Sequence, residues 1–340
     1  MSISTFNRPR FLRREFSQVA RWLLVAAITS RAVDAADEPD RLRGELRIHD
    51  PSTIIRCDTN FWVFGTGFGV RSKFSPDLVS WQAGPAVFKN PPAWTVEAVP
   101  NNRGSFWAPD VIRVGNRFLL YYSVSTWGSR HSAIGLATTP TLNPAALDFH
   151  WTDCGPVIQS RTNDNFNTID PSVLLDSSGR LWLSFGSYWS GIKLVELDPA
   201  TGLRRDTNAP VVSLAWNESI EASCLCQHRD FFYLFVNWGQ CCRGTNSTYE
   251  IRFGRSAKVT GPYLDQNGAD LMERGGTLFL SSSGHRIGPG HAGILREGGK
   301  EWFSYHFYDA NARGNSMFDL RPLRWTTNGW PELAPADGPE

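Results

Sequence analysis

The sequence HDPS at residues 49–52 returns as IDPS at residues 169–172, 120 positions later. Each copy precedes a short run rich in β-branched and aromatic residues, which is the pattern of a β-strand. Proline has no backbone N–H and restricts the residue before it, so we expect Asp50 and Asp170 to have extended backbone at the first position of a strand. The two copies therefore predict equivalent places in two repeated units.

Strand-rich blocks with an ionisable residue near their start recur along the rest of the chain. Their short strands are separated by Gly, Pro, Asn and Asp, and helical heptads are absent. The blocks begin 60, 60, 51 and 70 residues apart. A four-stranded unit of about 50 residues, repeated around an axis, is a propeller blade, and propellers have roughly 4–8 blades. We predict an all-β, five-bladed β-propeller whose blades begin at Asp50, Asp110, Asp170, Glu221 and His291.

A pair of β-sandwiches is the alternative fold, but it would not require an ionisable residue at the start of each block. In a propeller the innermost strands line a channel, so Asp50, Asp170 and Glu221 meet in one polar cleft. Like charges raise one another's pKa, so one carboxylate can stay ionised while another keeps its proton. Glycoside hydrolysis needs this pair, one group to activate water and one to protonate the leaving oxygen.

The first 35 residues differ from the rest and predict an export signal. Arginines precede an apolar run at residues 22–28, and AVDA at residues 32–35 suits a signal peptidase. Arg13-Arg14 fits a twin-arginine signal, with an ordinary secretory signal as the alternative. The apolar run is far shorter than the roughly 20 residues that a bilayer requires. We expect a periplasmic or extracellular protein that is free of the membrane after processing, with residues 36–340 as one domain.

The net charge and the cysteine content narrow the class of protein further. Removal of residues 1–35 takes away six of 34 basic and two of 33 acidic residues, which leaves a net charge of −3 and argues against a nucleic-acid partner. All six cysteines follow residue 35, where export permits disulfides. We expect a cross-strand bridge between the pair Cys224 and Cys226 and the pair Cys241 and Cys242, with the pairing open; a disulfide that holds the second loop is the other interpretation. Nothing requires more than a monomer.

The motifs HDPS, WAPDV, NTIDPSV, GSYWSGI, IEASC and GPGHA occur in this order and resemble glycoside hydrolase family 43, in its arabinanase and arabinofuranosidase branch. The resemblance spans roughly residues 44–330. It implies a five-bladed propeller that inverts anomeric configuration, with Asp50 as general base, Asp170 as modulator of the acid's pKa and Glu221 as general acid.

The implied substrates are plant cell-wall polysaccharides with α-L-arabinofuranosyl linkages, first of all the α-1,5 backbone of arabinan cut by an endo-arabinanase. An exo-acting α-L-arabinofuranosidase or a β-xylosidase, with arabinoxylan as a substrate, is the alternative within the enzymes. A propeller lectin without turnover is the alternative from another class, but a lectin has no need of three carboxylates at strand mouths.

Other residues have supporting roles in this interpretation. By the resemblance, His291 in GPGHA supports a calcium or other ion that is held through water near the base, and no organic cofactor is implied. We expect Asp110 to organise its blade and His49 to be structural. Flat aromatic faces and polar groups at the cleft are candidate sugar contacts. The candidates are Phe106, Trp107, Asn167, Ser187, Trp189 and Arg313.

Overall fold

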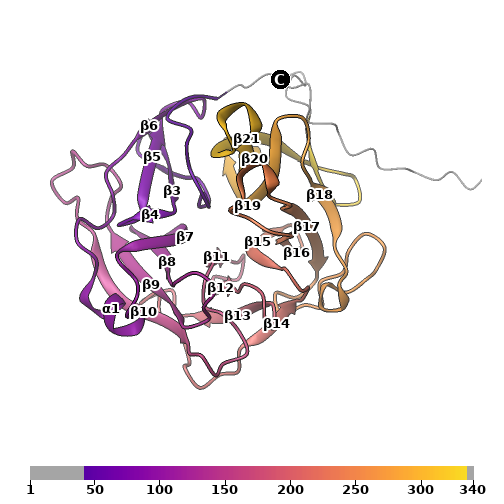
Figure 1. Ribbon diagram of the computed structural model, residues 1–340, viewed down its shortest axis with the longest axis horizontal. Coiled ribbons are helices and arrows are strands. Elements are labelled where there is room, and N and C mark those ends of the chain that lie inside the picture. The colour runs from indigo at the N-terminus through magenta and orange to yellow at the C-terminus, as the bar shows by residue number, and fades with distance from the viewer. Residues whose placement is uncertain (1–41, 335–340) are drawn as a thin grey trace, which may run out of the picture. The chain divides into compact units, whose positions relative to one another are not determined.

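Five separate β-sheets surround a central axis in the computed structural model, which describes residues 42–334 (Figure 1). The prediction of an all-β, five-bladed propeller is confirmed. The predicted export signal lies outside the described residues.

The first two blades have five strands each, because the two-residue strands β1 and β4 extend them. From the outside inward, the first blade runs β1-β6-β5-β3-β2 and the second β10-β9-β8-β7-β4. The strands are β1 (Arg43–Gly44), β2 (Ile55–Cys57), β3 (Asn60–Gly65), β4 (Gly67–Phe68), β5 (Arg71–Ser75), β6 (Ser80–Ala83), β7 (Ser105–Val114), β8 (Arg117–Val124), β9 (Ser132–Thr139) and β10 (Thr152–Ser160).

The other three blades are four-stranded antiparallel meanders, in which each strand pairs with the next in sequence. Their strands are β11 (Ser172–Leu175), β12 (Leu181–Phe185), β13 (Ile192–Leu197) and β14 (Val212–Ala215); β15 (Glu221–His228), β16 (Phe231–Trp238), β17 (Glu250–Ser256) and β18 (Thr277–Leu280); and β19 (Arg286–Glu297), β20 (Lys300–Asp309), β21 (Asn315–Trp325) and β22 (Pro331–Leu333).

Helices are few and short in the described part of the chain. One α-helix, α1 (Ala93–Ala98), and the 3-10 turns η2 (Gly244–Asn246), η3 (Leu271–Glu273) and η4 (Ala310–Ala312) lie between strands. No helix within residues 42–334 has the length and apolar character needed to cross a membrane.

The ring of blades closes where the start of the described chain joins the last blade. Arg47 pairs with Met317 of β21, and the N–H of Phe318 donates to the carbonyl of Leu46 at 2.8 Å. The chain then enters the axis at HDPS and begins the first blade. Hydrogen bonds between the two ends thus fix where the first aspartate stands.

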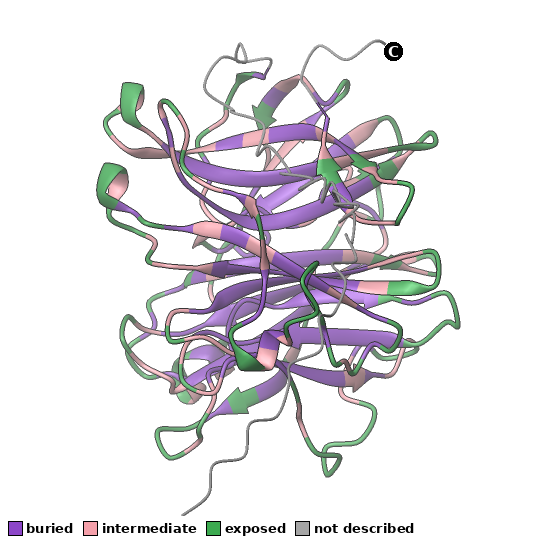
Figure 2. Cartoon of the chain, turned by 90° about the vertical axis from the view of Figure 1, so that its right-hand side faces the viewer, coloured by how far each residue is buried: buried purple, intermediate pink, exposed green. Residues whose placement is uncertain are grey.

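Buried strands and exposed loops alternate throughout (Figure 2). Aromatic side chains pack between neighbouring blades; the ring centroids of Phe235 on β16 and Phe303 on β20, for example, are 5.4 Å apart. Because each blade is covered on both faces by its neighbours, its strands read as nearly continuous apolar runs. The buried polar residues nevertheless include Asp110, Asp170, Glu221 and His291 at the axis.

Asp50 and Asp170 have left-handed backbone, so the expectation of extended backbone was wrong. Their φ angles are 49° and 58°. Such a conformation costs an L-residue roughly 1–2 kcal/mol, although aspartate tolerates it better than most. The following proline restricts these residues, but the bend required at the axis outweighs that preference, and strain of this kind is typical of functional sites.

The same bend recurs once in each blade. Ala108, Ala222 and His291 have φ angles of 41°, 53° and 60° at the corresponding places. Two of the predicted block starts are therefore displaced. Asp110 lies two residues after the equivalent position, Ala108, and Glu221 lies one residue before the equivalent position, Ala222. Side chains of all five innermost strands line one narrow space on the axis.

Asp110 was expected to organise its own blade, and its carboxylate in fact joins the two neighbouring blades. Its Oδ1 accepts from the N–H of Thr53 and its Oδ2 from the N–H of Val173, both at 2.9 Å. One carboxylate on the second blade therefore ties the innermost segments of the first and third. Burial raises the pKa of Asp110 to about 6, against these hydrogen bonds.

The predicted bridge between the two cysteine pairs is wrong. Cys241 and Cys242 form a disulfide with each other, and Cys224 and Cys226 are unbonded and buried. Cys224 lies opposite Phe235, six residues before Cys241. At about 3.3 Å per residue this separation exceeds the roughly 7 Å that a disulfide spans. The alternative, a disulfide within the loop, is the one observed.

Candidate active site

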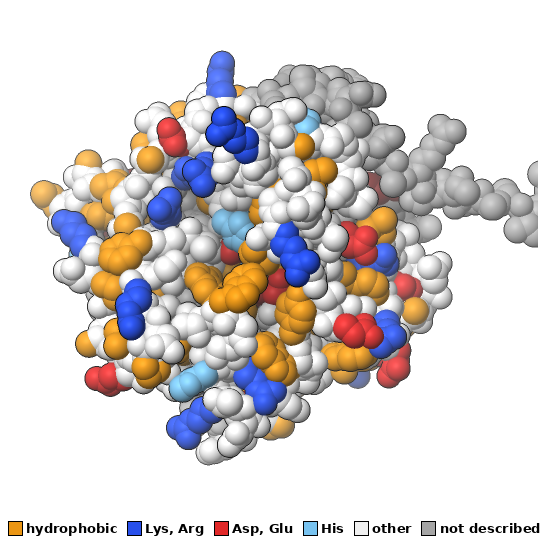
Figure 3. Space-filling model, viewed as in Figure 1, with side chains coloured by type: hydrophobic (Ala, Val, Ile, Leu, Met, Phe, Trp, Pro, Cys, Tyr) orange, Lys and Arg blue, Asp and Glu red, His pale blue; other side chains and the backbone are white. Residues whose placement is uncertain are grey.

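A cleft of about 480 Å³ opens beside the axis. Figure 3 shows hydrophobic side chains near the centre of this face, next to histidine and acidic side chains. The loops that follow the second strands of the second, third and fourth blades supply most of the lining, together with residues at the starts of the inner strands. The lining residues are Trp107, Thr126, Trp127, Gly128, Ser129, Asn167, Ile169, Ser187, Tyr188, Trp189, Glu221, Gln240, Cys241 and Arg243.

Asp50 is an ionised carboxylate held by two donors that flank the inner strands of the first blade. Its Oδ2 accepts from Thr66 Oγ1 at 2.6 Å and lies 2.8 Å from His49 Nδ1. Its Oδ1 is 3.7 Å from His291 Nδ1. Burial alone would raise the pKa of Asp50, but the charge and hydrogen bond of His49 outweigh burial and hold that pKa well below its usual range.

His306 defines the side of Asp50 that faces the fifth blade. The N–H of Asp50 donates to His306 Nδ1 at 3.2 Å, so this nitrogen carries the lone pair and the proton of the neutral ring sits on Nε2. Burial also lowers the pKa of His306 well below its usual value, in agreement with a neutral ring. Nε2 is buried and has no hydrogen-bond partner among residues 42–334.

Asp170 and Glu221 are buried carboxyl groups with the opposite electrostatic behaviour. Burial, followed by the charges of Glu221 and Asp50, holds the pKa of Asp170 well above its usual value, against a 3.1 Å hydrogen bond from the N–H of Ala222. The left-handed backbone at Asp170 turns its carboxylate towards the fourth blade, where Glu221 begins β15. The two groups form a coupled pair that resists losing both protons.

Glu221 lines the cleft and is held at both oxygens. Ser187 Oγ donates to its Oε2 at 2.7 Å, and the hydroxyl of Tyr249 donates to its Oε1. Burial raises the pKa of Glu221, although these two hydrogen bonds oppose the rise. Gly290 permits this arrangement, because a Cβ there would collide with the ring of Tyr249.

The site therefore combines one carboxylate with a lowered pKa, Asp50, and one carboxyl group with a raised pKa, Glu221, which lines the cleft. The first suits a general base and the second a general acid at the same pH. The predicted residues Asp50, Asp170 and Glu221 interact electrostatically, which places them in one site. A pair of titratable groups with pKa values pushed apart is the expected signature of acid–base catalysis.

His49, Asp50 and His306 form a group of possible metal ligands whose donor atoms lie within 4.8 Å of one another. Both ring nitrogens of His49 already have partners, Asp50 and Tyr308, and Nδ1 of His306 accepts from the backbone. Calcium takes about 6–8 oxygen ligands, so this set does not fit a calcium ion bound directly by side chains. The N–H at His306 Nε2 does fit a water molecule, including one bound to an ion. His291 is not a member of this group.

Four of the six predicted sugar contacts line the cleft: Trp107, Asn167, Ser187 and Trp189. Asn167 is buried, and its Oδ1 has no hydrogen-bond partner within residues 42–334, which suits a sugar hydroxyl. Trp189 is 39% exposed and forms part of the cleft wall. The hydroxyl of Ser187 instead donates to Glu221.

The other two predicted contacts, Phe106 and Arg313, do not line the cleft. Phe106 is fully buried and packs against Phe88 and Tyr122, with ring centroids 5.8 and 4.9 Å away. Its side chain points away from Trp107 because neighbours on a strand face opposite sides. Arg313 is exposed and ends η4 with left-handed backbone.

Several residues at the site escaped the sequence analysis. Thr66, Tyr249, His306 and Tyr308 all contact the carboxylates or their partners, and Trp127, at the rim of the cleft, is 76% exposed. Each lies on the second or third strand of a blade or in a loop, where no repeated motif marks it. The signal in the sequence was confined to the motifs at the starts of the inner strands and to GSYWSGI.

The comparisons with known proteins agree with this geometry. The model of glycosyl hydrolases family 43 matches residues 44–331. An extracellular exo-α-(1→5)-L-arabinofuranosidase of Cellvibrio japonicus is 37% identical over 302 residues, which are 85% of this chain and 87% of the relative. An extracellular endo-α-(1→5)-L-arabinanase of Bacillus subtilis is 38% identical over 289 residues, covering 84% and 87%.

A solved structure of a Cellvibrio cellulosa α-L-arabinanase complexed with arabinohexaose has a TM-score of 0.81 to this chain. It is 35% identical, and the match covers 86% of this chain and 96% of that one. The family match spans nearly all of the described propeller, including each motif at the axis. The chain therefore belongs to glycosyl hydrolases family 43.

Proposed function

We propose that this glycosyl hydrolase is an inverting arabinan endo-1,5-α-L-arabinanase. The observation that carries the proposal is the opposite pKa behaviour of Asp50 and Glu221 within one site, in a family 43 chain. The substrate is supported by relatives at 37% and 38% identity that are named for α-(1→5)-L-arabinan linkages.

Asp50 is the proposed general base, and its two oxygens have different tasks. Oδ2 already accepts from Thr66 and His49. Among residues 42–334, Oδ1 has no donor within hydrogen-bond distance; His291 Nδ1 is 3.7 Å away and His306 Nδ1 is 3.9 Å away. Oδ1 is therefore the atom that takes a proton from the attacking water.

Glu221 is the proposed general acid. Water attacks the anomeric carbon as the bond from that carbon to the leaving oxygen breaks, and Glu221 transfers its proton to that oxygen. Ser187 and Tyr249 orient the carboxyl group. Asp170 keeps a proton on the coupled pair at the pH of turnover. A single displacement inverts the anomeric configuration and requires base and acid carboxyls about 6.5–9.5 Å apart.

We propose Trp107, Trp189 and Asn167 as sugar contacts, because they line the cleft near Glu221. An ion held through water near His291 and His306 would place positive charge beside Asp50, and it would help to keep that carboxylate ionised. The enzyme's own residues perform each proton transfer.

We also propose that residues 1–35 direct export and that residues 36–340 act as a monomer outside the cytoplasm. The support is the N-terminal pattern, together with two relatives that are named extracellular. N-terminal sequencing of the exported protein tests the cleavage site, and sedimentation of the purified protein tests the monomer.

An exo-acting α-L-arabinofuranosidase is the second candidate, because one relative at 37% identity has that name. Product analysis of residues 36–340 on linear and branched arabinan separates the two. A ladder of arabino-oligosaccharides supports endo action, and a single small product supports exo action. Arabinoxylan and nitrophenyl glycosides serve as further substrates, and release from xylosides alone would contradict the arabinan assignment.

A further inference from the structure

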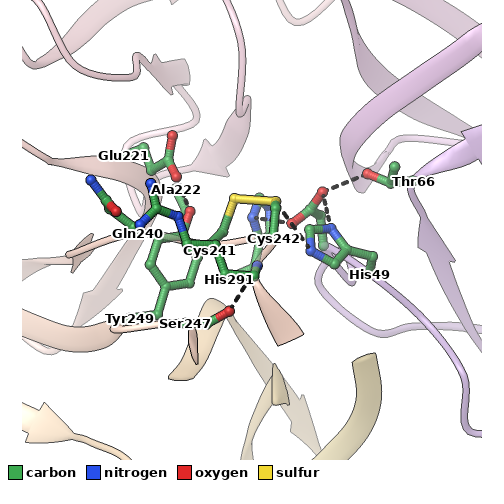
Figure 4. Close-up of a disulfide and its surroundings, with 12 residues drawn as sticks. His49, Thr66, Glu221, Ala222, Gln240, Cys241, Cys242, Ser247, Tyr249 and His291 are labelled. Atoms are coloured by element: carbon green, nitrogen blue, oxygen red, sulfur yellow. Dashed lines mark hydrogen bonds and ion pairs between the residues drawn. A yellow bond between two sulfur atoms is a disulfide. The ribbon is translucent and has the colours of Figure 1, made fainter. Parts of the chain in front are cut away.

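The Cys241–Cys242 disulfide lies between the two catalytic carboxyl groups rather than at the surface of a remote loop. Figure 4 shows it with Glu221 and Tyr249 on one side and His49 and Thr66 on the other. Cys241 lines the cleft together with Glu221. A covalent element in this position can affect both substrate contact and the base.

Cys242 contacts the partners of the base directly. Its N–H donates to the hydroxyl of Tyr308 at 2.7 Å, and its Sγ is 3.8 Å from His49 Nε2. The Tyr308 hydroxyl lies 2.8 Å from His49 Nε2, and His49 Nδ1 lies 2.8 Å from Asp50 Oδ2. A continuous chain of hydrogen bonds therefore leads from the disulfide loop to Asp50.

The direction of this chain follows from the charge on His49. In the charged form of His49 that pairs with Asp50, both ring nitrogens carry protons. Nδ1–H donates to Asp50 Oδ2 and Nε2–H donates to the Tyr308 oxygen, which also accepts from the N–H of Cys242. The ring orientation of His49 thus depends on where Tyr308, and with it the loop, is held.

Hydrogen bonds between its two sides hold the rest of the loop at residues 240–248, and the disulfide restrains the backbone at Cys241 and Cys242. Gln240 N–H donates to Thr248 Oγ1 at 3.0 Å, and Arg243 N–H donates to Ser247 Oγ at 3.1 Å. Cys242, between these bonds, has left-handed backbone with a φ of 66°. A non-glycine residue persists in this conformation only where its surroundings hold it.

We propose that the Cys241–Cys242 disulfide is a positioning element of the active site: it keeps Tyr308 and His49 aligned with Asp50 and forms the cleft wall beside Glu221. The proposal rests on the proposed role of Asp50 as the base. Reduced, the two side chains rotate independently, the wall loses its shape, and the hydrogen bond from Cys242 to Tyr308 is no longer held.

Reduction with dithiothreitol tests the proposal. This dithiol supplies two electrons and two protons; the S–S bond breaks, two thiols form, and the reagent closes to its cyclic disulfide. Thiol titration should rise by two per chain. We expect kcat on linear arabinan to fall at least fivefold with a rise in KM, and both to recover on reoxidation. Two new thiols with unchanged kcat and KM would overturn the proposal.

Variants separate this bond from the other cysteines. The double variant Cys241→Ser/Cys242→Ser should have low kcat that dithiothreitol does not lower further. Tyr308→Phe should lower kcat in the oxidised enzyme and lose most of the response to reduction, because both changes interrupt one chain of contacts. Cys154→Ser is the matched control, since Cys154 is unbonded and does not line the cleft; it should keep wild-type kcat and the full response.

A measurement without substrate keeps this proposal distinct from the proposed function. In protein with ¹⁵N-labelled histidine, the ring signals of His49 should shift on reduction, whereas those of the exposed His150 should not. If the oxidised enzyme fails to cut arabinan, the proposed function fails, but the His49 signals still show whether the disulfide positions His49. Unchanged His49 signals after reduction would overturn the positioning role.

Discussion

His49 Nδ1 lies 2.8 Å from Asp50 Oδ2, so the residue that precedes the proposed base in the chain is also its charge partner. The left-handed backbone of Asp50 allows two neighbours in sequence to face each other in this way. The pair keeps one carboxylate ionised in a buried site, and it occupies one oxygen so that the other remains for water. His49 is therefore more than the structural residue expected from the sequence.

Glu221→Gln should remove turnover while binding persists. The amide has no proton to give to the leaving oxygen, so kcat on linear arabinan should fall by about 10²–10⁴-fold. Calorimetry should find arabino-oligosaccharide affinity within a few-fold of wild type. The loss should be much smaller on an aryl arabinofuranoside with a good leaving group, which needs little protonation. Equal losses on both substrates would argue against Glu221 as the acid.

Asp170→Asn should shift the alkaline limb of the pH profile of kcat. Glu221 must be protonated to act, so activity is present below its raised pKa and is lost as pH rises through it. Asp170 and Glu221 repel each other when both are ionised, and removal of one charge lets the other lose its proton more easily. The limb should therefore move to lower pH. An unmoved limb, with kcat alone reduced, would assign Asp170 a role in orientation only.

The fold could be predicted because the axis of a propeller leaves a repeated mark in the sequence. HDPS, WAPD, IDPS, IEASC and GPGHA stand where the five inner strands bend, and their spacing gave five blades. The bend itself could not be predicted, because proline favours extended backbone locally and only the packing of five strands around one axis selects φ angles near 50°.

The partners of the carboxylates could not be predicted for a related reason. Tyr249 lies in a loop and His306 on the second strand of its blade, where aromatic and polar residues are common and no spacing separates a site residue from a packing residue. The prediction of a bridge between the cysteine pairs was wrong because the sequence indicates which strands pair but not the register, which decides which residues lie opposite each other.

Asp110→Ala should destabilise the whole propeller. The change leaves the N–H groups of Thr53 and Val173 buried without their acceptor, and each costs about 1–3 kcal/mol. We expect the free energy of unfolding in urea to fall by about 2–6 kcal/mol. Asp110→Asn is the matched control, because its amide oxygen still accepts one of the two bonds and should lose less. Equal stability of Asp110→Ala and wild type would contradict the role of Asp110 as a tie between blades.

Trp189→Ala should weaken substrate binding more than it slows the chemical step. The ring lines the cleft and is 39% exposed, so its loss removes apolar contact with a sugar without emptying the core. We expect KM for linear arabinan to rise about tenfold, which corresponds to ~1.4 kcal/mol, with kcat within a few-fold. Phe68→Ala is a suitable control, since Phe68 is 51% exposed and does not line the cleft. A KM equal to that of the control would exclude Trp189 from the sugar site.

Removal of a bound ion should lower kcat if the water-held ion proposed near Asp50 is present. The side chains there offer few free lone pairs, so the ion would be held chiefly by water and should leave readily to a chelator. We expect elemental analysis to find about one ion per chain, EDTA to reduce kcat several-fold, and calcium to restore it. The direction follows from charge: a cation beside Asp50 favours its ionised form, which the base must have before it can accept a proton. His306→Gln removes the buried N–H at Nε2, which has no partner among residues 42–334, and should lower the ion content alongside kcat. Full activity in protein shown to contain no metal would leave His49 as the sufficient source of positive charge at the base.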